Sequence, residues 1–471
     1  MTASAQTAIL NRQAIGLVLG PILAAVMYLT LLLAAPAIAH DARSVAAIGV
    51  LMATWWICEP VHVGVTALMP VTLFPVLGVV SVGSAAAPYA SDVIFLFAGG
   101  FLLGLAMQRW GLHQRIALTV IGVVGVSPAR VVAGFMAATA IMSMWVSNTA
   151  TSMLMLPIVV SVVGLTTRSD DAASRTGSAS APDHEHAPTD LAGNNLAMCL
   201  LLGVAYAASI GGVATLIGTP PNVFLASFAK EQLQIDISMG RWMLVTAPLC
   251  AVFLVVTWLL LTRVLHPLKG LDLSEAAAHL RERRQSLGRV SRGEAVVMIV
   301  FAMTASAWVS RDGLNALGTS LGWGWLEHLR DSSIALLAAG VLFLTPVSLR
   351  ERTMTLDWAT AQRLPWGVLI LFGGGLSLAS AVTATELDTA IASGVGALRG
   401  VPPIVLVVTI ALAVVFLTEV TSNTAIAAAA LPVLTAAGPS LGLDPLTLIV
   451  PATIAASFAF MLPVATPPNA I

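Results

Sequence analysis

Long apolar stretches separated by short polar segments recur along the whole chain. Ten of them approach the roughly 20 residues that an α-helix needs to cross a bilayer, so the pattern predicts an all-α polytopic membrane protein. We expect spanning helices at 14–39, 44–59, 61–83, 91–111, 197–228, 241–265, 294–310, 332–349, 366–385 and 444–467.

Two further apolar stretches, 130–167 and 402–438, are interrupted near their middles by the same tripeptide, Ser-Asn-Thr. The first reads "MWVSNTATSMLMLPI" from Met144 and the second "TEVTSNTAIAAAALPV" from Thr418. Polar caps inside an apolar run indicate a break in the helix. We predict that each stretch is a re-entrant hairpin with Ser-Asn-Thr at its tip.

Charge is sparse and gathers mainly in loops. Only 10% of the residues are charged, against about a quarter in soluble domains. The segments 263–292 and 349–365 are rich in arginine, so we predict that both are cytoplasmic. Counted back along the spans, this places the N-terminus in the cytoplasm if 130–167 enters and leaves the membrane from the same side, which favours a re-entrant hairpin there. The polar stretch 168–195 is predicted to be a mobile cytoplasmic loop, and His184 and His186 within it are too few for a closed metal site.

Matched motifs recur at fixed offsets. Ser147 and Ser422 lie 275 residues apart, as do the ends of "FLFAGG" and "LILFGGG", whereas the two "TPPN" motifs lie 247 apart. The difference of 28 equals the length of the polar stretch 168–195. One insertion in the first half therefore explains why the two offsets differ, and the pattern indicates an internal duplication.

With one extra helix at the start, the two halves become an inverted repeat, a plan shared by many secondary transporters. We predict an extra helix at 1–43, a first repeat at 44–265, a basic linker at 266–293 and a second repeat at 294–471. The first repeat holds the hairpin 130–167, the insert 168–195 and a broken helix at 197–228. The second holds the hairpin 402–438 and a broken helix at 444–471, and we expect it to lack a last helix.

The hairpin tips have a defined chemistry. A tip joins the carbonyl end of one helix to the N–H end of the next, so it can hold Na⁺ on oxygens and an anion on N–H groups. The double prolines of "TPPN" free further carbonyls at Gly218 and Ala465. From Val131 to Thr167, and throughout 402–438, the hairpins contain no Lys or Arg, so we expect an anion to need co-bound Na⁺. Glu419 stands where the first hairpin has Met144, and we interpret it as a structural acid rather than a gate.

The motifs "SNTATSMLMLP", "TSNTAIAAAALP", "IGTPPN" and "VATPPNA" resemble the paired signatures of the divalent anion/sodium symporter (DASS) family. The resemblance implies a homodimer with a scaffold domain, a transport domain and an elevator-type motion. It implies sodium-coupled import of C4-dicarboxylates such as succinate, malate or fumarate across a bacterial cytoplasmic membrane. Members of that family continue past the second "TPPN", whereas this chain stops at Ile471.

The resemblance also assigns roles to residues. Sodium contacts fall on Ser143, Ser147, Asn148, Gly218, Thr418, Ser422, Asn423 and Ala465. Substrate contacts fall on Ser147, Asn148, Thr149, Thr219, Pro220, Ser422, Asn423, Thr424, Thr466 and Pro467.

Alternatives within the family are a sodium-independent dicarboxylate exchanger and a citrate or sulfate transporter. A channel is disfavoured because filters usually form at subunit axes. An enzyme is not predicted, because a serine nucleophile needs a paired base and His62 and His113 share no motif with a serine. No cofactor beyond Na⁺ and no nucleic-acid partner is expected, since the chain carries no basic stripe.

Overall fold

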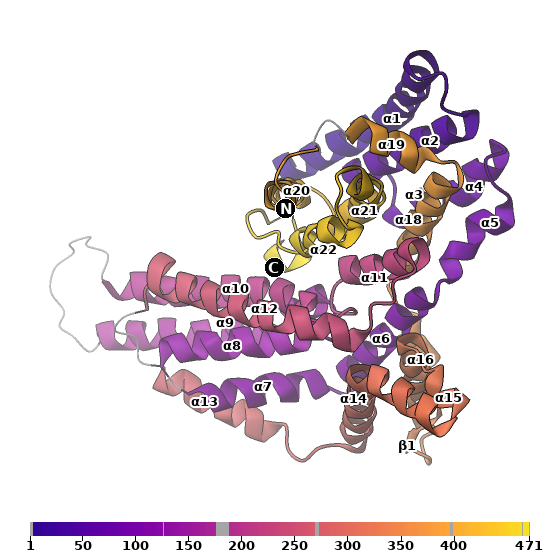
Figure 1. Ribbon diagram of the computed structural model, residues 1–471. Helices are drawn as coiled ribbons and strands as arrows, with labels where there is room; N and C mark the ends of the chain where they lie inside the picture. Colours follow the sequence, from indigo (N-terminus) through magenta and orange to yellow (C-terminus); the bar gives the residue numbers. More distant parts are fainter. Residues whose placement is uncertain are drawn as a thin grey trace.

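The computed structural model describes residues 3–125, 127–175, 188–268, 273–395, 399–463 and 465–470, and helices make up most of these ranges (Figure 1). The elements of the first half are α1 (Ala3–Ala34), α2 (His40–Cys58), α3 (Val63–Thr66), α4 (Met69–Val76), α5 (Val82–Ala86), the 3-10 helix η1 (Ala87–Ala90), α6 (Asp92–Arg109), α7 (Leu112–Val124), α8 (Pro128–Ser143), α9 (Asn148–Arg175), α10 (Pro188–Val213), α11 (Pro220–Leu233), α12 (Met239–Leu259) and the π-helix η2 (Leu260–Leu265).

The linker and the second half contain α13 (Ser274–Ser286), α14 (Arg292–Leu321), α15 (Gly324–Glu327), α16 (Asp331–Leu344), β1 (Pro346–Ser348), β2 (Thr353–Met354), α17 (Trp358–Ala361), α18 (Trp366–Ala384), α19 (Leu387–Val395), α20 (Pro403–Thr418), α21 (Asn423–Ser440), α22 (Pro445–Ala456) and α23 (Pro467–Ala470). Strands β1 and β2 pair antiparallel.

Six helical stretches in the described ranges are long and apolar enough to cross a bilayer, which confirms the helical membrane class. They are Arg12–Ala34, Val82–Arg109, Asn194–Val213, Met239–Leu265, Arg292–Leu321 and Trp366–Ala384. The first and fourth of them face mainly outward, since only 6% and 17% of their apolar 18-residue windows are buried in the chain itself. Such apolar exposure is what contact with lipid requires.

The prediction of one spanning helix at 61–83 is wrong. The chain forms three short helices there, α3, α4 and α5. Pro70 lies in the first turn of α4, Pro75 lies inside it, and Gly78 takes a positive φ of 75° just after it. Proline removes a backbone donor and a left-handed residue ends the helix, so hydrophobicity alone overestimated its length.

The insert 168–195 was predicted as a loop, and this is wrong at its two ends. Helix α9 continues to Arg175 and α10 already begins at Pro188. Alanine and arginine are good helix formers, so the helix extends past the apolar run. The motif at His184 to His186 lies outside the described residues. The linker 266–293 also contains a helix, α13.

Helix boundaries repeat at the offsets of the motifs. Helices α8 and α20 span 128–143 and 403–418, both shifted by 275, and α9 and α21 start at Asn148 and Asn423. Helices α11 and α23 start at Pro220 and Pro467, shifted by 247. The chain therefore breaks its helices at both Ser-Asn-Thr motifs and both "TPPN" motifs, as the sequence predicted.

The repeated glycine blocks bring two long helices close to the first "TPPN" break. A Cβ at Gly100 of α6 would lie 3.0 Å from Ile217, and one at Gly375 of α18 would lie 2.7 Å from Phe224. Ile217 precedes the break and Phe224 follows it. Glycine thus permits a close approach from both sides that a larger residue would prevent.

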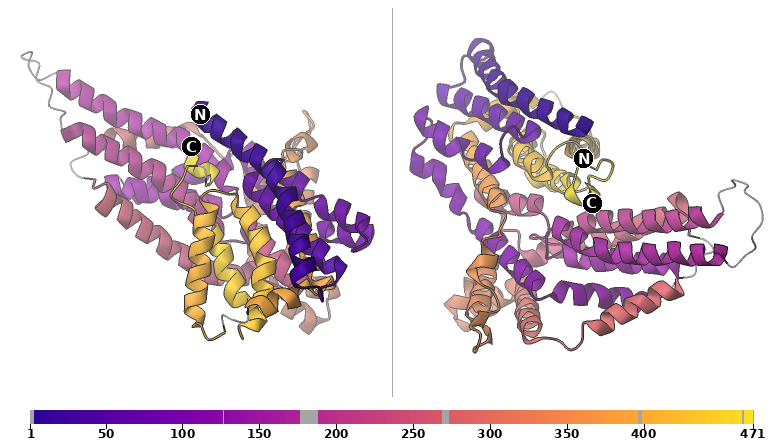
Figure 2. Two further views of the ribbon diagram at one scale, coloured as in Figure 1. Left: turned by 90° about the horizontal axis from the view of Figure 1, so that it is seen from above. Right: turned by 180° about the vertical axis from the view of Figure 1, so that it is seen from behind.

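Helices α8, α9, α10 and α12 run side by side, with α7 and α13 along their outer edge (Figure 1). The second-half helices α20, α21 and α22 form a separate group, and the further views agree (Figure 2). Helix α23 at the C-terminal end contacts α9 and α10, so the two halves meet where their helices break.

Candidate functional site

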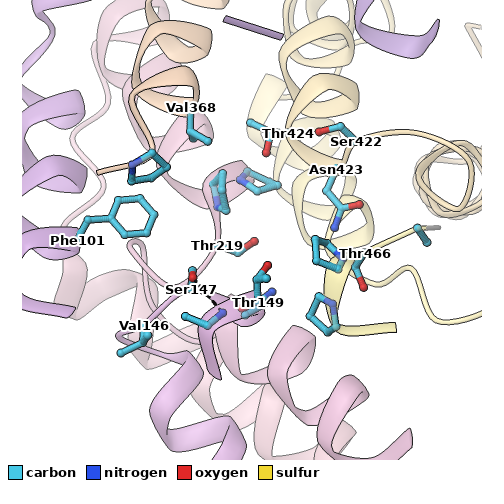
Figure 3. A pocket seen from close by; sticks show the side chains of 18 of the residues that line it. Phe101, Val146, Ser147, Thr149, Thr219, Val368, Ser422, Asn423, Thr424 and Thr466 are labelled. Carbon is cyan, nitrogen blue, oxygen red and sulfur yellow. Dashed lines mark hydrogen bonds between the residues drawn. The ribbon is translucent and has the colours of Figure 1, made fainter. Parts of the chain in front are cut away.

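A cavity of about 710 Å³ lies where the breaks of both halves meet (Figure 3). All ten residues predicted to contact substrate line it: Ser147, Asn148, Thr149, Thr219, Pro220, Ser422, Asn423, Thr424, Thr466 and Pro467. They come from two segments in each half, and matched residues of the two halves are 275 or 247 positions apart in sequence. The structure thus brings this set together, while the contacts assigned to each residue remain predictions.

Three helices begin at the cavity wall. These three longer helices are α9 at Asn148, α11 at Pro220 and α21 at Asn423, and a fourth, the short α23, begins there at Pro467. Thr219 precedes α11 in extended backbone, and Pro220 and Pro221 occupy its first turn, where a missing N–H costs little. Helix N-termini carry free N–H groups and a partial positive charge, so the cavity favours an anion.

At the first break, backbone and side-chain oxygens crowd together. The buried Ser143 Oγ lies 2.7 Å from Asn148 Oδ1 and 2.7 Å from Ala208 O. A Cβ added at Gly218 would lie 2.4 Å from Gly212 O and 2.9 Å from Ser143 O. Neutral carbonyl and amide oxygens at broken helices are the groups that hold Na⁺ in transporters.

The same internal hydrogen bond occurs in the unwound segment of each half. The Asn222 amide donates to Thr215 O at 2.8 Å, and the Asn469 amide donates to Leu462 O at 3.2 Å. Donor and acceptor are both shifted by 247 residues. The asparagine of each "TPPN" motif therefore closes its own break from inside, which explains why the motif needs an amide at this place.

At the second break, Glu419 is 3% exposed and acts as an acceptor. Its carboxylate receives the backbone N–H groups of Phe460 at 2.7 Å, Met461 at 3.0 Å and Leu462 at 2.8 Å. The Tyr206 hydroxyl, from α10 of the first half, donates to Phe460 O at 3.0 Å. These contacts support the interpretation of Glu419 as a buried structural acid.

Two oxygens of the second break that lie at the cavity have no partner among the described residues. They are Asn423 Oδ1 and Thr466 Oγ1, both buried at the cavity. Thr418, the counterpart of Ser143, donates to Val415 O at 2.9 Å within its own helix instead of reaching the asparagine. Asn222 Oδ1 at the first break also lacks a partner among the described residues, so each break leaves an oxygen available to a ligand. The breaks differ in the asparagine of Ser-Asn-Thr, whose oxygen accepts from Ser143 at the first break and has no partner at the second.

The residues predicted to contact sodium divide into two layers. Ser147, Asn148, Ser422, Asn423 and Ala465 line the cavity. Behind this wall lie three buried residues, Ser143, Gly218 and Thr418.

The cavity wall also carries charges that the sequence did not reveal. Arg12, Glu59 and Arg363 line it, and Arg12 donates to the carbonyl oxygens of Ile57 and of Val420, the latter at 2.9 Å. The expectation that the site lacks fixed positive charge is therefore wrong, because arginines arrive from outside both hairpins. The basic segment 349–365, which contains Arg363, was a sequence signal for this charge, whereas nothing in the sequence pointed to Arg12.

A helical membrane protein whose two matched halves meet at one polar cavity belongs to the class of membrane transporters. A model of the family described as "Sodium:sulfate symporter transmembrane region" matches residues 16–471. The chain belongs to this family, the divalent anion/sodium symporters that its motifs resemble. It is accordingly a transporter and not an enzyme.

Curated relatives cover nearly the whole chain. It is 38% identical to the sodium-dependent dicarboxylate transporter SdcS of Staphylococcus saprophyticus over 98% of its own length and 85% of the relative's. It is 39% identical to the protein of the same name from Staphylococcus aureus (strain USA300), over 98% of this chain and 84% of that one.

Proposed function

We propose that the protein is a sodium-coupled symporter that imports C4-dicarboxylates such as succinate, malate or fumarate across a bacterial cytoplasmic membrane. The observation that supports this most is the single cavity to which both halves contribute a Ser-Asn-Thr and a "TPPN" segment. A molecule with two like ends suits a site built from two like segments. The names of the two relatives point to the same substrate class.

Sodium enters the proposal through charge balance. A dianion in the cavity meets helix N-termini, each worth about 0.3–1 kcal/mol when exposed and up to about 2 kcal/mol when partly buried. Arg12 and Arg363 add positive charge, but Glu59 on the same wall offsets part of it. Na⁺ held by oxygens at the two breaks would supply the remainder. Linkage then requires succinate and sodium to tighten each other's binding by the same factor.

Transport also requires access from both faces of the membrane. In this proposal the hairpins 130–167 and 402–438 re-enter from opposite faces, and the domain that carries them moves as a unit within a homodimer. The N-terminus is cytoplasmic. An impermeant thiol reagent should then label Glu282→Cys only from the cytoplasm and Arg399→Cys only from outside. Labelling of both from one side would contradict the inverted arrangement.

Uptake of labelled succinate into proteoliposomes tests the function itself. Purified protein should accumulate succinate under an inward sodium gradient and fail to do so when choline replaces sodium. Uptake that needs internal succinate and ignores sodium would support the exchanger instead. Stronger competition by unlabelled citrate or sulfate than by malate would move the substrate to those anions.

A further inference from the structure

A second polar cleft lies between α7 and α13, on the outer edge of the first-half bundle (Figure 1). It has a volume of about 640 Å³ and shares no lining residue with the central cavity. Helix α7 contributes Arg115 and Thr119, and α13 contributes Arg281 and Arg284. Spacings of four and three place each pair on one helix face. Arg289, just after α13, completes the basic wall.

Arg115 shapes this cleft. Its guanidinium pairs with Glu294 at 2.9 Å and donates to Gly288 O at 3.1 Å and to Leu287 O at 3.2 Å. The carbonyl groups that follow the C-terminal end of α13, where the helix dipole is negative, are thereby covered. Arg115 is neutralised by Glu294, so it fixes the geometry of the cleft without adding to its net charge.

The other arginines carry the charge of the cleft. Arg281, Arg284 and Arg289 are exposed, and none of them forms an ion pair or side-chain hydrogen bond with the residues that the structure describes. Glu282, also exposed on α13, does not line the cleft. Three unpaired guanidinium groups beside the Thr119 hydroxyl form a set of donors suited to phosphate, which arginine recognises through two parallel N–H bonds.

Apolar surface borders the same cleft. Arg284 Nη1 lies 3.4 Å from the position of a Cβ at Gly122 on α7. The next residue, Val123, is 78% exposed. A phosphate held by Arg284 would therefore lie near the apolar side chain of Val123, whose exposure to water is unfavourable. This combination of a basic pocket and an apolar edge fits a phospholipid better than a free phosphate ion.

We propose that the cleft between α7 and α13 binds the phosphate of an anionic phospholipid, with Arg281, Arg284 and Arg289 as its ligands and Arg115 as a positioning residue. The site is independent of the transported substrate. It would attach α13, the helix in the linker between the halves, to the headgroup layer. The loss of this site therefore leaves the central cavity intact.

The test is lipid retention measured by native mass spectrometry. The full chain is reconstituted with a mixture of phosphatidylglycerol and phosphatidylcholine and then released in mild detergent. Wild-type protein should keep bound phosphatidylglycerol in preference to phosphatidylcholine. The double variant Arg281→Gln/Arg284→Gln should lose it. Arg350→Gln/Arg352→Gln, which removes two arginines from another basic loop, should keep it.

Equal retention by wild type and by the Arg281/Arg284 variant would overturn the proposal, as would equal retention of the two lipids. A third arm adds inorganic phosphate at matched ionic strength. Binding of inorganic phosphate that the Arg281/Arg284 variant loses, together with no preference of wild type for phosphatidylglycerol, would assign the cleft to a free anion and overturn the lipid assignment. Both variants change exposed side chains only, so folding is not at issue.

Discussion

Gly218→Ala is the sharpest test of the first cation site, because the second half already carries alanine at the matching position, Ala465. A Cβ at position 218 would lie 2.4 Å from Gly212 O and 2.9 Å from both Gly212 Cα and Ser143 O. All three atoms belong to the backbone, so no side chain can rotate to make room. The added methyl group must push apart the oxygens proposed to hold Na⁺.

The size of the effect follows from the cost of overpacking. Extra methyl groups in well-packed sites typically cost about 1–3 kcal/mol. When this strain falls on the cation-bound geometry, it weakens binding by about 5- to 150-fold. We therefore expect the sodium concentration for half-maximal uptake by Gly218→Ala to rise by a factor in this range, with a smaller change in the preference among anions.

The assay is succinate uptake into proteoliposomes across a sodium titration, with choline keeping the ionic strength constant. Ala465→Gly is the matched control: it removes a Cβ and creates no clash, so its sodium dependence should stay close to wild type. Size-exclusion chromatography and thermal unfolding establish that each variant is folded. A folded Gly218→Ala protein with the sodium dependence of wild type would refute the cation site at the first break.

Three further predictions concern the cavity and its support. Asn148→Ala and Asn423→Ala should each abolish succinate uptake while the protein stays monodisperse; wild-type uptake by either would contradict the site. Glu419→Gln should lower the free energy of unfolding by about 1–3 kcal/mol, because an amide offers one acceptor oxygen to the N–H groups that both carboxylate oxygens now accept; an unchanged thermal midpoint would argue against this. Arg363→Gln should weaken succinate uptake most at low ionic strength, because Arg363 is exposed and salt screens its attraction for the anion. An effect of the same size at all salt concentrations would contradict this long-range electrostatic role.

The helix breaks could be predicted because they are written twice. A single Ser-Asn-Thr in an apolar run would have been ambiguous, but Ser147 and Ser422 at an offset shared with other motifs identified both breaks. The same reasoning failed for 61–83, where no repeat pointed to a break and the prolines were outweighed by the apolar composition. Hydrophobicity measures burial or lipid contact, and it does not by itself measure helix length.

The charged wall of the cavity could not be predicted, for a different reason. Arg12 and Arg363 are 351 residues apart in sequence, and each lies outside the duplicated motifs. Their position depends on how α1 and the segment before α18 pack against the second hairpin, which is a tertiary property. A sequence pattern can place a residue on an element, but it does not say which elements meet.

In the two halves, different side chains bind the unwound segment before the "TPPN" motif to the neighbouring hairpin. In the first half the Thr215 hydroxyl donates to Met144 O and accepts from Gly218 N at 3.0 Å. In the second half Leu462 stands at the position of Thr215 and Glu419 at that of Met144. A leucine has no hydroxyl, and a carboxylate only accepts hydrogen bonds. The hairpin therefore holds the second segment through its N–H groups, with one carboxylate, while Tyr206 and Asn469 bind its carbonyl groups.

This exchange has an electrostatic consequence. Thr215 is neutral, whereas the buried carboxylate of Glu419 belongs to the residue that directly follows Thr418. Attraction between opposite charges grows as the surroundings become less polar, so a carboxylate at this depth acts strongly on a cation nearby. The two cation sites proposed for the breaks are thus built from matched positions but are unequal in charge. The second has a buried carboxylate beside it, while the first relies on closely packed neutral oxygens.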